Sequence, residues 1–141
     1  MSKGAVGLLI ATVLATSCST VTPVKISAGD QCFRCRRLIT DGNLAAEMVD
    51  GSFVTTYKTA GCLAKYLADH PSPAAAVFVT DYPTGTLVSP ARVLFVPVVI
   101  DRVTNETDYR AYLSATLATA TAAEFQTQPL DWKTVLSKAK L

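Results

Sequence analysis

Two short stretches in the first half of the chain carry the pattern of paired strands. Residues 44–49 are apolar apart from one glutamate, and residues 53–57 alternate Phe, Thr and Tyr with Val and Thr. Successive side chains of a strand point to opposite faces of a sheet, so this alternation predicts strands. Asp50-Gly51 between them is a two-residue turn signal, because these residue types tolerate a positive φ. We therefore expect a β-hairpin.

A helical period follows the hairpin. Over residues 60–68, four larger side chains are spaced three and four positions apart and share one face. These side chains are Cys62, Leu63, Tyr66 and Leu67. Thr59 supplies a hydroxyl for the N-cap, and Asp69-His70-Pro71 is expected to end the helix.

The remaining predicted elements repeat this order. An apolar strand at 75–80 leads through a turn at 81–85 to a short extended piece at 86–88. The second half is predicted to begin with one helical turn at Ser89-Pro90 and a strand over 93–103, with Pro97 at a bulge or edge. A polar turn over 104–108 leads to a return strand over 109–117. A short helix, capped by Thr119 or Thr121 and ending at Phe125, and a final helix over 131–138 complete the chain. Both halves thus run strand, turn, strand, helix. We expect an α+β fold with an antiparallel sheet.

The first residues have the layout of an export signal. Residues 4–14 are apolar or small apart from one threonine, a lysine precedes them, and small residues lead up to Cys18. This run is too short to span a bilayer, so it predicts a signal peptide over residues 1–17, either of lipoprotein type with Cys18 lipidated or of the ordinary secreted type. Residues 18–29 predict a tether or an extended first strand. Residues 30–141 then form a domain outside the cytoplasm.

Composition narrows the class of protein. The chain has 141 residues, of which 17% are charged, and a formal net charge of +2. That length suits a single domain, and the charge is too low for a disordered tail or for the dense cationic face of a nucleic-acid binder. We therefore expect one folded domain that binds no nucleic acid and is held at a membrane by a lipid on Cys18.

Four cysteines carry the candidate chemistry. If Cys18 is acylated, Cys32, Cys35 and Cys62 remain, and three thiols in an oxidising compartment predict a soft-metal site or a redox pair with a spare thiol. If Cys18 is free, two disulfides use all four. The three arginines at positions 34, 36 and 37 favour thiolates at the Cys-x-x-Cys pair. The structural alternatives are a disulfide-closed loop and a buried, inert Cys62.

The sequence offers little for catalysis. His70 is the one histidine, and it lies at the predicted helix end, where it caps the helix or faces solvent. A single histidine does not complete a Ser-His-Asp or Cys-His arrangement convincingly, and the sequence has neither a phosphate-binding glycine loop nor an HExxH zinc motif. We expect a protein that is not an enzyme.

The order of these motifs resembles the NosL family, which comprises accessory lipoproteins linked to nitrous oxide reductase that handle copper outside the cytoplasm. The likeness covers most of the chain after the signal. It is carried by Cys32-x-x-Cys35, Leu44-Ala45-Ala46-Glu47, Asp50-Gly51 before Phe53, Cys62-Leu63 with Tyr66, residues 79–85, Pro90-Ala91, Ala122-Ala123-Glu124-Phe125 and the segment around Trp132. The resemblance implies the family fold, a pair of strand-strand-helix-strand units shared with organomercurial lyase.

The resemblance also implies binding of Cu(I) and its delivery to a partner such as nitrous oxide reductase. Two methionines usual in the family are absent, since Arg37 stands at the first position and no methionine follows Met48. Copper would then be held by the thiolates of Cys32, Cys35 and Cys62, which suit a trigonal Cu(I) site. The alternatives are a Cys-x-x-Cys thiol-disulfide oxidoreductase and a structural lipoprotein whose metal site has decayed.

Overall fold

Six strands form one mixed sheet in the computed structural model, which describes residues 20–141. The signal peptide predicted over residues 1–17 and Cys18 lie outside the described residues. The strands are β1 (Ala46–Asp50), β2 (Phe53–Tyr57), β3 (Ala76–Asp81), β4 (Thr86–Val88), β5 (Leu94–Asp101) and β6 (Glu106–Tyr112). Their order is β2-β1-β3-β6-β5, with β4 beside β3, and every pair is antiparallel except β3 with β6. The α+β class and the mainly antiparallel sheet are confirmed.

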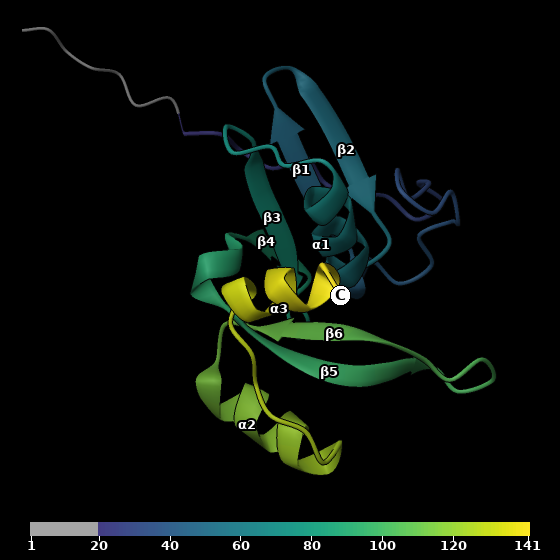
Figure 1. Ribbon diagram of the computed structural model, residues 1–141, viewed down its shortest axis with the longest axis vertical. Helices are drawn as coiled ribbons and strands as arrows, with labels where there is room; N and C mark the ends of the chain where they lie inside the picture. Colours follow the sequence, from purple (N-terminus) through teal and green to yellow (C-terminus); the bar gives the residue numbers. More distant parts are fainter. Residues whose placement is uncertain (1–19) are drawn as a thin grey trace, which may run out of the picture.

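Three α-helices pack against this sheet. They are α1 (Ala60–Asp69), α2 (Ala115–Glu124) and α3 (Trp132–Ala139), and two single 3-10 turns accompany them, η1 (Gly42–Leu44) and η2 (Pro90–Arg92). Figure 1 shows α1 and α3 close together, with α2 on the other side of the β5–β6 hairpin. The helices therefore enclose two separate apolar clusters, one on each side of that hairpin.

The larger cluster lies beneath α1 and α3, and its biggest buried side chains include Tyr57, Leu63 and Phe95. The smaller cluster joins β5 to α2 through Val96 and Val98. Neighbouring residues of β5 thus point to opposite clusters, as the pleat of a strand requires. The strand is apolar on both faces because both are covered.

The first half of the chain follows the prediction closely. Strand β2 has the predicted bounds, Gly51 in the hairpin turn has a φ of 59°, and Thr59 caps α1 by accepting the Cys62 N–H at 3.1 Å. Strand β1 begins two residues later than predicted. Asp41 accepts the Asn43 N–H with its carboxylate and holds residues 42–44 in the turn η1 instead.

The second half departs from the prediction at the return strand. Residues 106–108 belong to β6 rather than to the turn, and β6 ends at Tyr112 because the next N–H, that of Leu113, donates to the buried carboxylate of Asp81. Helix α2 then starts at Ala115 with Ser114 as its cap, so the caps predicted at Thr119 and Thr121 are wrong. The Thr119 hydroxyl donates to the Ala115 carbonyl inside the helix instead.

Other features of the second half agree with expectation. Pro97 sits on β5, which is an edge strand, and the irregularity in the pairing lies further along, between Val99 and Asp101. One feature differs from a pair of strand-strand-helix-strand units, because a single bridge between Phe95 and Leu130 stands where the third strand of the second unit would be. Trp132 packs its ring against Phe95, with the ring centroids 5.3 Å apart, which fixes α3 to the sheet.

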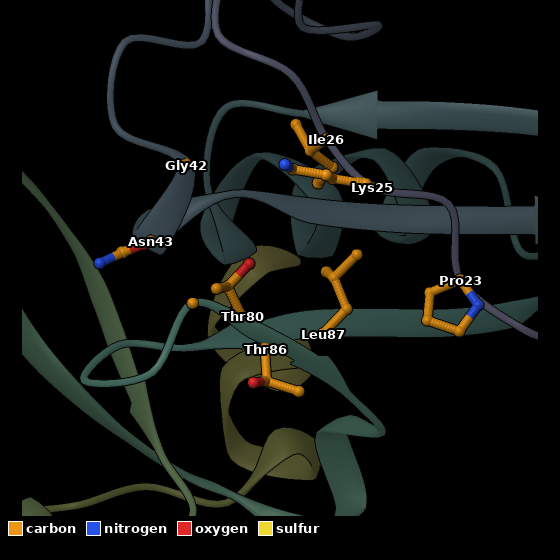
Figure 2. Close-up of a pocket in the computed structure, with 9 residues that line it drawn as sticks. Pro23, Lys25, Ile26, Gly42, Asn43, Thr80, Thr86 and Leu87 are labelled. Carbon is orange, nitrogen blue, oxygen red and sulfur yellow. The ribbon is translucent and has the colours of Figure 1, made fainter.

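The start of the described chain lies against the sheet beside β4. Val24 donates its N–H to the carboxylate of Glu47 at 2.8 Å, and Glu47 is fully buried, with no hydrogen-bond partner for its second oxygen among residues 20–141. A pocket of about 420 Å³ remains between this segment, η1 and β4. Figure 2 shows Lys25 and Ile26 on one side of it and Leu87 on the other.

Replacing Glu47 tests how much the burial of its carboxyl group changes the free energy of unfolding. Burial raises the pKa of Glu47 above its ordinary value of 4.5, and the hydrogen bond from Val24 only partly offsets this. The folded state therefore binds the proton more tightly than the unfolded state, and the stability this contributes below about pH 4.5 is lost as the pH rises. We expect the Glu47→Gln variant to gain in free energy of unfolding relative to the wild type with rising pH.

Urea unfolding at several pH values measures this difference. The exposed Glu124 of α2 supplies the control, since Glu124→Gln should leave the pH profile of the wild type unchanged. Parallel profiles for the wild type and Glu47→Gln would contradict the expectation.

Candidate metal centre

The Cys-x-x-Cys sequence forms a tight loop closed by backbone hydrogen bonds. Cys32 N–H donates to the Arg37 carbonyl and Arg36 N–H donates to the Cys32 carbonyl, both at 2.9 Å. Gln31 and Leu38 pair across the base of the loop as an antiparallel bridge. The chain reverses at Arg36, which has a φ of 63° in the left-handed region. These bonds direct both cysteine side chains of the loop to the same side, with Cys35 N–H 3.5 Å from Cys32 Sγ.

Strand β2 holds this loop in place. Phe33 N–H donates to the Thr56 carbonyl at 2.8 Å, and the Thr56 hydroxyl donates to the Gln31 carbonyl at 3.3 Å. The Phe33 ring then makes edge contacts with Tyr57 of β2 and Tyr66 of α1, at centroid distances of 6.2 Å and 5.5 Å. The loop is thereby attached to β2, which precedes Cys62 in the chain, and to α1, which contains Cys62.

A half-buried carboxylate sets the start of α1, where Cys62 lies. Asp108 of β6 accepts hydrogen bonds from the Thr59 hydroxyl at 2.6 Å and from the Gly61 N–H at 2.9 Å. Thr59 in turn caps the Cys62 N–H. Asp108 accepts the Gly61 N–H, which has no partner within the helix, so it fixes the first turn of α1 to β6. Gly61 is needed there, because a Cβ would lie 2.6–2.8 Å from the carboxylate atoms.

The three thiols meet at one point. The Sγ atoms of Cys32, Cys35 and Cys62 all lie within 4.8 Å of one another, and no disulfide links any of them to another cysteine within residues 20–141. Cys62 donates its S–H toward Cys35 Sγ across 4.0 Å. Three thiolates around a metal in a flat trigonal site lie about 4.0 Å apart when each bond is about 2.3 Å, as in zinc thiolates. The cluster therefore has nearly the spacing that a bound metal requires.

Hydrogen bonding distinguishes the thiol of Cys35. Burial acts to raise its pKa, but hydrogen bonds from the Arg37 backbone, from Cys32 and from the Arg37 side chain outweigh it, so the pKa of Cys35 is lowered. The S–H of Cys62 adds to this effect. Cys35 is thus better stabilised as a thiolate than a free cysteine and is a natural ligand for a soft cation.

Cys62 has the opposite character. Burial raises the pKa of its thiol to about 12, and the negative charges of Cys32, Cys35 and Asp108 raise it further against the hydrogen bond from Thr59. At neutral pH this thiol carries its proton. Three anionic sulfurs so close together repel one another, and a cation among them removes that repulsion. Binding of a metal by all three sulfurs therefore requires the thiols to lose their protons.

The sequence-predicted site residues have distinct places in this structure. Cys32, Cys35 and Cys62 are brought together, so the inert role considered for Cys62 does not describe its position. Cys18 lies outside the described residues. His70 is exposed at the end of α1 and stacks on Tyr66 at 4.5 Å. The arginines differ, since Arg37 contacts the cluster while Arg34 and Arg36 face solvent.

Two residues that matter here were missed by sequence reasoning. Asp108 was placed in a turn, and Gly61 carried no expectation beyond its place in a helix. Glycine in the first turn of a predicted helix is the one local signal, because glycine weakens a helix and is retained where something approaches closely. Nothing in the local sequence indicated that Asp108 would be that neighbour.

No family model, curated protein or solved structure matches this chain. Among residues 20–141, none of the helices combines the length and apolar character that a bilayer crossing needs.

Substituting Gly61 tests how the start of α1 positions Cys62. In Gly61→Ala the new methyl group collides with the Asp108 carboxylate, so we expect a loss of about 1–3 kcal/mol in the free energy of unfolding. We also expect weaker metal binding, because the first turn of α1 must shift. Denaturant unfolding and a metal titration measure the two effects. Gly42→Ala is the matched control, since its Cβ meets nothing within 4 Å; equal behaviour of the two variants would contradict the role of Gly61.

Proposed function

We propose that this protein is a NosL-type accessory protein that holds Cu(I) between Cys32, Cys35 and Cys62 and passes it to a partner such as nitrous oxide reductase. In this proposal it is not an enzyme, and it works outside the cytoplasm, tethered to a membrane through a lipid on Cys18. The observation that carries the metal-binding part is the convergence of three free thiols from two distant segments. Export and tethering rest on the signal-like pattern of residues 1–17.

The ligand set favours a soft monovalent cation. The metal-binding group that the described residues provide consists of sulfur alone, and thiolates select Cu(I), zinc and iron–sulfur centres. Structural zinc sites are almost always four-coordinate, whereas three sulfurs suit trigonal Cu(I). The spacing of 4.0 Å between the sulfurs of Cys35 and Cys62 supports the trigonal arrangement.

The absent methionines support reliance on thiolates. Arg37 occupies one family methionine position and pairs through two hydrogen bonds with Glu106, at 2.8 Å and 3.1 Å. Met48 is buried in the larger apolar cluster, with 5% of its surface exposed. Arg37 therefore supplies no thioether to the three thiols. Binding in this chain depends on three sulfurs that are already within reach of one ion.

A thiol-disulfide oxidoreductase is the second candidate, and one observation favours it. Cys35 has a lowered pKa and lies 4.0 Å from the sulfur of Cys62, so an attack by the Cys35 thiolate on an oxidised partner followed by closure with a neighbouring thiol is geometrically accessible. A disulfide within the cluster would leave one thiol and no trigonal site. Metal binding and disulfide formation are therefore mutually exclusive.

A Cu(I) titration of the reduced protein tests the proposal. We expect one tightly bound Cu(I), and a loss of affinity of at least about tenfold, or about 1.4 kcal/mol, in Cys62→Ser because a hydroxyl is a poor ligand for a soft ion. The double variant Cys32→Ser, Cys35→Ser should bind far more weakly still. Ser114→Ala, which alters a helix cap far along the chain, is a control for general destabilisation. A double variant that binds as tightly as the wild type would reject the proposal.

Proton release on metal binding gives an independent check. Because the pKa of Cys62 is about 12, its proton must leave when all three sulfurs bind the metal at neutral pH. We therefore expect apparent affinity for Cu(I) to rise about tenfold per pH unit for each proton displaced, and to fall on acidification. Competition titrations between about pH 6 and pH 8 measure the slope. A slope of zero would show that Cys62 is not a ligand.

A further inference from the structure

Cys35 is the sulfur of the cluster that lies in an exposed segment. Cys32 is fully buried, and Cys62 lies between two buried residues of α1, Gly61 and Leu63. Cys35 instead lies in the closed loop, where both its neighbours are exposed. A molecule that approaches from solvent therefore reaches the cluster most directly at Cys35.

Five exposed residues lie within three positions of Cys35 along the chain, and we call them the Cys35 rim. They are Phe33, Arg34, Arg36, Arg37 and Leu38. Phe33 and Leu38 are the two apolar members of the rim, with 39% and 58% of their surfaces exposed. The guanidinium of Arg36 lies over the Phe33 ring, 5.3 Å from its centroid. Exposed aromatic and arginine side chains together are typical of protein interfaces rather than of inert surface.

The rim carries an excess of positive charge. Glu106 pairs with Arg37 at 2.8 Å and with Lys58 at 3.6 Å, so a single carboxylate faces two cations. Within residues 20–141, Arg34 and Arg36 have no carboxylate at ion-pair distance. The acidic residue just before the loop, Asp30, accepts the Ser27 N–H with its carboxylate. Two arginines thus remain free to meet negative charge on another molecule.

We propose that the Cys35 rim is the docking surface for an acidic protein that exchanges Cu(I) with the cluster. This rests on the proposed function. In the exchange, a thiolate of the acidic protein forms a bond to Cu(I) while the bond from Cys35 breaks, so copper stays Cu(I) and no electron is transferred. Cys35 leaves as a thiolate that Arg37 stabilises, and the incoming thiol gives its proton to solvent. A protein is favoured over a lipid surface because the rim encloses a metal-donating sulfur, and lipids offer no thiolate to receive the ion.

Transfer of copper to two synthetic peptides tests the docking surface. The peptides carry the same pair of cysteines, flanked by aspartates in one and by serines in the other. From the loaded wild-type protein at low salt, we expect the acidic peptide to take Cu(I) at least about tenfold faster than the neutral one. The advantage should shrink as ionic strength rises to about 0.15 M, where the Debye length is about 8 Å.

Charge removal at the rim should abolish this preference. The variant Arg34→Gln, Arg36→Asn lacks both unpaired cations, and asparagine tolerates the positive φ at position 36. We expect it to keep the affinity for Cu(I) and to deliver copper to both peptides at one similar rate. The control Arg92→Gln, Lys133→Gln removes the same charge from exposed positions of η2 and α3 and should retain the preference.

The outcomes separate this inference from the proposed function. A wild-type protein that binds no Cu(I) would overturn the proposed function itself. A wild-type protein that binds Cu(I) but serves both peptides equally fast would overturn only the docking inference. A rim variant that loses retention on phosphatidylserine vesicles while its transfer rates stay unchanged would identify the rim as a membrane contact and also overturn the inference.

Discussion

The candidate metal centre depends on a hydrogen-bonded carboxylate that lies far from it in the sequence. Asp108 ties the first turn of α1 to β6, and this sets where Cys62 points. Burial raises the pKa of Asp108, which three hydrogen bonds from Thr59, Tyr109 and Gly61 counteract. A carboxyl partly removed from water is costly unless its oxygens are paired, so this contact stabilises one arrangement of helix and strand rather than several. This arrangement fixes the position of Cys62 relative to the other two thiols.

The surroundings of the cluster explain why its three thiols have unequal roles. Tyr57 and Cys32 are fully buried beside the apolar cluster under α1, and burial raises the pKa of Tyr57 to about 12. Such surroundings disfavour several negative charges at once, so the negative charge concentrates on Cys35, where N–H groups of the loop can stabilise it. A cation changes this balance because it removes both the repulsion and the protons. The structure thus favours the occupied site over three free thiolates.

The sequence was most informative where structure is decided locally. The hairpin turn at Asp50-Gly51 and the Thr59 cap are choices made within a few residues, and both were predicted correctly. Periodicity also placed Cys62 on the inner face of α1. It could not show that this face meets the Cys-x-x-Cys loop, because that depends on hydrogen bonds between Phe33 and Thr56 across the fold. The end of β6 was missed for the same reason, since a distant carboxylate, that of Asp81, binds the Leu113 N–H.

Unequal anchoring of the three sulfurs bears on how such a site releases an ion. Cys62 belongs to a helix packed on the core, and Cys32 is buried and bonded to Arg37 through its backbone. Cys35 lies in the part of the loop outside the sheet, beyond the bonds that Phe33 makes with β2. Local opening costs least where few buried contacts must break. In the proposed site Cys35 is therefore the ligand whose bond to an ion can break first, through movement of the loop and without unfolding of the domain, while the bonds from Cys32 and Cys62 break afterwards.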